Sequence, residues 1–177
     1  MTKEIHKEID VIASYLTLVE KDKVRHALKL SEEAHANQLR KSGDPFITHP
    51  LEVAKILTSI KLDADSIVAG LLHDTLEDTN LNIEEIDKNF GKQIVELVDG
   101  LTKINKYSLK VNNQKFGENY KKLILATTQD LRVILIKLAD RLHNMRTIHF
   151  IKDRNKKINT SLETLEVFAP LAQRLGM

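Results

Sequence analysis

The stretch Val133–Asp140, with the sequence VILIKLAD, is the most apolar run in the chain and decides how the fold is interpreted. A run this short and apolar could form a buried strand, because periodicity alone does not separate a buried strand from a buried helix. The next stretch, Asp140–Thr147 (DRLHNMRT), continues it without a turn signal. We therefore predict one central helix through both stretches.

The hydrophobic periodicity is helical along nearly the whole chain, and glycine (6) and proline (3) are scarce. Pro50 suits the first turn of a helix, Asp63 or Asp65 can cap the helix that runs into His73, and Gly176 suits a helix end. The predicted helical segments are 1–20, 24–34, 51–57, 63–73, 83–90, 92–104, 118–129, 133–147 and 155–175. The sequence thus predicts an all-α domain of about eight to eleven helices.

Residues 105–117 are the exception to this pattern. They are rich in Lys, Asn and Gln and show weak periodicity. We interpret them as a mobile loop that could close over a substrate as a lid.

Composition narrows the functional classes. The length of 177 residues fits one domain, and 42% hydrophobic and 29% charged residues are ordinary for a soluble globular protein. A net charge of +2 does not by itself indicate nucleic-acid or membrane binding. No apolar run approaches a membrane span, and the N-terminus lacks the apolar core of a signal peptide, so we expect a cytoplasmic protein. The chain has no cysteine, so any metal site must use histidine and carboxylates.

The segment Leu71–Thr79 (LLHDTLEDT) carries the strongest chemical signal. His73 and Asp74 are adjacent and can bind one divalent metal, and Glu77 and Asp78 follow four residues later. If the segment is one helix, His73 lies over Glu77 and Asp74 over Asp78. Carboxylates gathered so closely repel one another unless a cation neutralises them.

Further metal ligands must come from elsewhere in the chain. His49 lies in a loop bounded by prolines, where it can present a ring nitrogen. Asp140 ends the apolar run, and burying an acid there is costly unless it is paired or bound to a metal. Asn144 and Thr147 follow on the same face of the predicted helix and suggest a second wall of a pocket.

The order His, His-Asp, Asp resembles that of the HD superfamily of metal-dependent phosphohydrolases. The surrounding residues look like the hydrolase domain of the RelA/SpoT alarmone enzymes, over about Val24 to Met177. The stretches that carry this resemblance are Arg40–Pro50 (RKSGDPFITHP), Leu71–Thr79 (LLHDTLEDT), Val98–Lys103 (VDGLTK), Ile136–Thr147 (IKLADRLHNMRT) and Thr164–Ala172 (TLEVFAPLA).

The resemblance implies removal of the 3′-pyrophosphate from guanosine tetra- and pentaphosphate with Mn²⁺, giving GDP or GTP. The roles that it implies are metal binding by His49, His73, Asp74 and Asp140; catalysis by Glu77 and Asp78; and contact with the guanosine nucleotide by Arg40, Lys41, Asn144 and Thr147. Two departures, Phe46 for a frequent Tyr and Gln173 for a frequent His, lie outside the metal motif. Many family members continue into a synthetase domain where this chain stops, at Met177.

The residues leave other interpretations open. Stand-alone relatives are associated with NADPH 2′-phosphatase activity, other HD proteins cleave other nucleotides, and a non-catalytic nucleotide-sensing module would use the same fold. We interpret His6, His26, His35 and His149 as surface or helix-face residues and His143 as structural. Lys137, Arg141 and Arg146 could attract phosphates, but they are equally well explained as helix-surface charges. The sequence does not indicate the oligomeric state.

Overall fold

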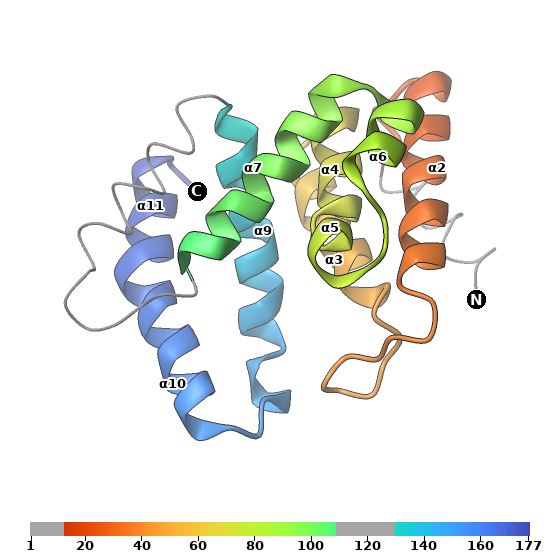
Figure 1. The fold of residues 1–177 in the computed structure, drawn as a ribbon. Helices are drawn as coiled ribbons and strands as arrows, with labels where there is room; N and C mark the ends of the chain where they lie inside the picture. The colour runs from red at the N-terminus through yellow and green to blue at the C-terminus, as the bar shows by residue number, and fades with distance from the viewer. Residues whose placement is uncertain (1–12, 109–129) are drawn as a thin grey trace.

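The computed structural model describes residues 13–108 and 130–177 (Figure 1), and it confirms the all-α prediction for them. Within these residues no strand is formed; Leu39 and Pro45 make one isolated bridge. The elements are α2 (Leu18–Ala34), α3 (Thr48–Ser59), α4 (Ala64–Leu72), α5 (Thr75–Asp78), α6 (Ile83–Phe90), α7 (Lys92–Ser108), α9 (Leu131–Arg146), the 3₁₀ turn η1 (Ile148–Phe150), α10 (Arg154–Glu163), the π-helical η2 (Thr164–Phe168) and α11 (Ala169–Arg174).

The apolar run at Val133 is a helix and not a strand, as predicted. It forms the buried part of α9. Helix α4 is buried along its whole length and packs against α2, α3, α7 and α9. Gly70 permits the close approach of α3, since a Cβ atom there would lie 2.5 Å from Leu57 Cδ1. Figure 1 shows α9 between α3 and α4 on one side and the pair formed by α10 and α11 on the other. The two helices that carry the predicted His73 and Asp140 motifs are therefore neighbours in the core.

Side-chain caps begin several of these helices, and the cap of α4 is the one that the sequence analysis named. Thr17 forms a capping box with Glu20 at the start of α2, and Asp63, rather than Asp65, caps α4. Asp130 caps α9. Helix α3 begins at Thr48, so Pro50 occupies the third helical position and not the first.

Several predicted segments differ in extent or regularity from the structure. Residues 13–16 form a turn and α2 starts at Leu18, so a helix through residue 20 is wrong for this part; residues 1–12 lie outside the described residues. Helix α7 continues to Ser108, which removes 105–108 from the predicted loop. The remainder of that loop and the predicted helix 118–129 lie outside the described residues. The last helix is not uniform, because the π-helical η2 joins α10 to α11.

In the described part of the chain, every helix is too short or too polar to cross a membrane.

Candidate metal centre

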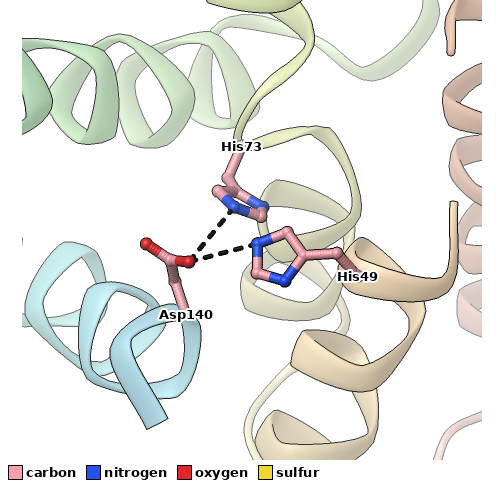
Figure 2. Close-up of side chains that lie close together, drawn as sticks. All are labelled: His49, His73 and Asp140. Carbon is pink, nitrogen blue, oxygen red and sulfur yellow. Dashed lines mark ion pairs between the residues drawn. The ribbon is translucent and has the colours of Figure 1, made fainter. Parts of the chain in front are cut away.

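Three buried side chains from distant parts of the sequence converge on one point (Figure 2). His49 lies in the first turn of α3, His73 follows the last residue of α4, and Asp140 lies in α9. The Oδ1 atom of Asp140 lies 3.1 Å from Nε2 of His49 and 3.8 Å from Nε2 of His73. One ligand atom from each residue falls within 4.8 Å of the others, which is the spacing of a shared cation.

Asp74, the fourth predicted ligand, lies beside this cluster of three. Its Oδ2 atom lies 3.1 Å from Nε2 of His73 and 3.6 Å from Nε2 of His49. Two imidazole nitrogens and two carboxylates suit a borderline divalent ion when no cysteine is available. Their arrangement and the fold suggest that a divalent metal ion binds here.

The segment that carries His73 and Asp74 is not one continuous helix, so that part of the prediction is wrong. The four-residue spacing is kept for one pair, because the N–H of Asp78 donates to the carbonyl of Asp74 at 2.9 Å. Helix α4 ends at Leu72, and α5 begins at Thr75 after a two-residue turn. Two side chains at this turn donate hydrogen bonds to backbone carbonyls of α4. Thr75 Oγ1 donates to Leu72 O at 2.7 Å, and His73 Nδ1 donates to Gly70 O at 2.8 Å.

The hydrogen bond to Gly70 also orients the His73 ring for metal binding. Because a carbonyl only accepts, Nδ1 of His73 carries a proton and Nε2 can present its lone pair to the centre of the cluster. Nε2 is buried and makes no hydrogen bond with the described residues. Asp74 Oδ2 and Asp140 Oδ1 lie 3.1 and 3.8 Å from this nitrogen, and a cation among the three atoms would be attracted by all of them.

The electrostatics of the cluster favour positive charge at its centre. Burial opposes a charged His73, but Asp74 and Asp140 outweigh it and raise the pKa of His73 to about 9. Burial likewise opposes a charged Asp140, yet the Lys137 ammonium and the two histidines hold the pKa of Asp140 well below its usual range. The field that favours a proton on His73 equally favours a metal cation.

The other predicted site residues surround this cluster in a cleft of about 640 Å³. Its walls include Asp74 and Asp140 together with Arg40, Lys41, Glu77, Asp78, Asn144 and Thr147. Burial, followed by the negative charge of Asp74, raises the pKa of Asp78. Asn144 Nδ2 donates to Asp140 Oδ1 at 2.6 Å, so the predicted face of α9 does lie along the cleft.

Cations line the part of the cleft that carries Arg40 and Lys41. Burial lowers the pKa of Arg40, although the carboxylates Asp74, Asp140 and Asp44 partly offset the effect. Burial also lowers the pKa of Lys41, and the neighbouring Lys156 adds to that shift. Acidic ligands and cationic side chains thus share one cleft, an arrangement suited to a metal ion and a phosphorylated substrate.

The sequence missed several residues that shape the site. His35 is buried, not on the surface, and its ring stacks on Phe46 with centroids 4.4 Å apart. Lys137 is buried and pairs with Asp140 Oδ2, and Arg141 pairs with Glu163 at 2.7 Å, so neither is a simple surface charge. The only available signal was helical spacing, since Lys137 lies three residues before Asp140.

This fold and cluster define an HD domain, and the HD domain family model matches residues 27–177. The chain therefore belongs to the HD domain family.

Proteins similar to this chain include RelA/SpoT enzymes, the family that the sequence motifs indicated. The chain is 50% identical over 159 residues to a GTP pyrophosphokinase of Myxococcus xanthus, covering 88% of this chain and 21% of that protein. It is 44% identical over 168 residues to the guanosine-3′,5′-bis(diphosphate) 3′-pyrophosphohydrolase of Vibrio cholerae, covering 95% and 24%. With the bifunctional (p)ppGpp synthase/hydrolase SpoT of Escherichia coli the identity is also 44%, covering 94% and 24%. The chain thus spans less than a quarter of the length of these relatives.

A solved structure of a metazoan orthologue of SpoT, described as hydrolysing ppGpp, has a similar fold. It matches with a TM-score of 0.66 and 27% identity, covering 82% of this chain and 83% of that one.

Proposed function

We propose that this domain is a Mn²⁺-dependent hydrolase of guanosine tetra- and pentaphosphate that releases the 3′-pyrophosphate and leaves GDP or GTP. The observation that carries the proposal is the convergence of two imidazoles and two carboxylates from three separated stretches in a cleft that also holds cationic side chains. The relatives support the substrate, because two of those similar to the chain are named as (p)ppGpp hydrolases.

In this proposal, His49, His73, Asp74 and Asp140 hold the metal. A divalent ion bound there neutralises phosphoryl charge and makes a nearby water more acidic. His49, His73 and Asp140 are buried, and the hydrogen bond from His73 to Gly70 holds one ring in the orientation for binding.

Glu77 and Asp78 are the proposed catalytic carboxylates. A water attacks the phosphorus nearest the ribose, the bond from that phosphorus to the 3′-oxygen breaks, and the 3′-oxygen takes up a proton. Burial and the charge of Asp74 raise the pKa of Asp78, which is the direction that makes this carboxylate a better proton acceptor. Either carboxylate can act as the base, since both line the cleft.

Arg40, Lys41, Asn144 and Thr147 are the proposed contacts to the nucleotide. The guanidinium of Arg40 can stack on a purine and also offset phosphate charge. Lys41 lies beside Lys156, and the two ammonium groups repel each other. A bound phosphate would attract both. Asn144 and Thr147 lie on α9 and at its end, on the opposite wall.

The decisive experiment measures pyrophosphate release from ppGpp by the purified domain with Mn²⁺. We expect turnover by the wild type, a loss of roughly 10²-fold or more in Glu77→Gln, and wild-type activity in Glu84→Gln, a matched control on the exposed face of α6.

Other outcomes would select another function. Phosphate release from NADPH without turnover of ppGpp would indicate a 2′-phosphatase. Binding of metal and nucleotide without any turnover would indicate a nucleotide-sensing module. Anomalous scattering at the manganese edge from crystals soaked with Mn²⁺ would test the metal: density at the cluster supports the assignment, and density elsewhere alone contradicts it.

A further inference from the structure

A polar link joins the end of α2 to the proposed catalytic helix α5. His35 follows the last residue of α2 and is 3% exposed. Its Nδ1 atom lies 2.9 Å from Oε1 of Gln38, and Nε2 of Gln38 donates to the backbone carbonyl of Asp78 at 2.7 Å. The link spans 40 residues of sequence and ends on the backbone of a proposed catalytic carboxylate.

The backbone carbonyl of Asp78, at one end of this link, determines which group donates in each of its hydrogen bonds. The carbonyl of Asp78 can only accept, so the amide nitrogen of Gln38 faces it and the amide oxygen faces His35. The amide oxygen also only accepts, so His35 must carry its proton on Nδ1. The other ring nitrogen, Nε2, is buried and has no partner among the described residues. A buried ring nitrogen without a proton costs less there than a buried N–H without an acceptor. The burial of Nε2 therefore also supports the tautomer with the proton on Nδ1.

The same two residues also hold the loop that presents Arg40. The backbone N–H of Phe46 donates to the carbonyl of Gln38 at 3.0 Å, and the His35 ring stacks on the ring of Phe46. The other side of Phe46 faces the His49 ring, edge to face, at 6.3 Å between centroids. Figure 1 shows this loop running from the end of α2 to the start of α3. One pair of side chains thus contacts both the loop and the helix that carry proposed functional groups.

Helix α5 needs such a support because it is short. It contains four residues, Thr75–Asp78, and its N-cap Asp74 makes no side-chain capping hydrogen bond. A single helical turn is marginal on its own, so contacts from outside the helix decide where Asp78 lies. Gln38 supplies one at the last residue of the turn.

We infer that His35 and Gln38 are positioning residues that hold Asp78 in register with the metal cluster and with the Arg40 loop. This inference rests on the proposed function. The side chain of Gln38 reaches Asp78, whereas the loop is held by the main-chain carbonyl of Gln38. Removing the amide should therefore disturb the catalytic step more than substrate binding.

The test compares Gln38→Leu with a matched control, Gln173→Leu, on the exposed side of α11. In Gln38→Leu we expect kcat for ppGpp to fall about 10- to 100-fold, as a displacement of a catalytic group by 1 Å can cause. KM should stay within about threefold of the wild type, and Mn²⁺ affinity measured by calorimetry should be unchanged. An unchanged kcat, or a loss confined to KM, would overturn the inference.

His35 provides the second part of the test. His35→Asn keeps an N–H donor near the position of Nδ1 and should retain most of kcat, whereas His35→Leu should lose about as much as Gln38→Leu. In kcat, the double variant His35→Leu/Gln38→Leu should be no worse than either single variant, because both interrupt the one link to Asp78. Any effect of the lost stacking of His35 on Phe46 should fall on KM, since Phe46 lies in the Arg40 loop. Additive losses would contradict a shared link.

A measurement on the wild type keeps this inference separate from the proposed function. Imidazole ¹⁵N spectra report which nitrogen of His35 carries the proton, whether or not the protein turns over ppGpp. A proton on Nδ1 supports the link, and a proton on Nε2 refutes it. A wild type that releases no pyrophosphate refutes the proposed activity but leaves the spectroscopic result to decide the link.

Discussion

The Nδ1 atoms of His49 and His143 lie 2.6 Å apart, so one ring donates a hydrogen bond to the other. If Nε2 of His49 binds the metal, its Nδ1 must carry the proton and His143 must accept it. Burial, with the neighbouring His49 and Arg40, lowers the pKa of His143 to about 4, which keeps that ring neutral and able to accept.

We therefore predict that His143→Leu weakens Mn²⁺ binding by about 10- to 100-fold, the usual cost of losing a partner of a metal ligand. Calorimetric titration with Mn²⁺ measures this loss directly. His26→Leu is a suitable comparison, because its ring contacts Phe90 and not the cluster, and it should bind Mn²⁺ like the wild type. Equal affinities in the two variants would show that His143 does not orient His49.

At the scale of elements, one arginine connects the starts of two core helices. Arg132 contacts Asp130, the N-cap of α9, at 2.6 Å and Asp63, the N-cap of α4, at 2.8 Å. Hydrogen bonds from Arg132 lower the pKa of Asp130. Burial opposes the same change at Asp63, but hydrogen bonds from Ser66 and Arg132 lower its pKa as well.

Because both carboxylates have lowered pKa values in the folded state, their stabilisation is complete above the unfolded pKa of about 4. It is lost as the pH falls through the folded values. We expect Arg132→Met to lower the free energy of unfolding by about 1 kcal/mol at pH 7. The difference from the wild type should narrow from about pH 5 towards pH 2. Urea unfolding across this range measures it, and a difference that is constant with pH would argue against the network.

At the scale of the whole molecule, a metal bound to the cluster would cross-link α3, the turn between α4 and α5, and α9. A ligand that binds only the folded state stabilises it by about 2.7 kcal/mol at a concentration of 100 times Kd. We expect Mn²⁺ to raise the Tm and EDTA to reverse the change. Asp140→Asn should abolish the increase, whereas Asp87→Asn, on the exposed side of α6, should preserve it. An equal increase in both variants would place the stabilising ion elsewhere.

The sequence by itself determined the helical class and a cap of α4, and the site residues that its motifs indicated stay a prediction. These follow from local physics: the spacing of apolar residues, the side chains that cap helix ends, and acids such as Asp140 that are costly to bury alone. The residues in the metal motif are recognisable because divalent ions need a small set of donor types.

Only the tertiary structure decided how those residues meet. The turn at His73 and Asp74 is accompanied by side-chain hydrogen bonds to backbone carbonyls, which helical spacing does not reveal. The contacts His49–His143, Lys137–Asp140 and Gln38–Asp78 each depend on where a second element packs. Hydrogen-bond partners 40 or 94 residues apart leave no local pattern, because packing in three dimensions brings them together.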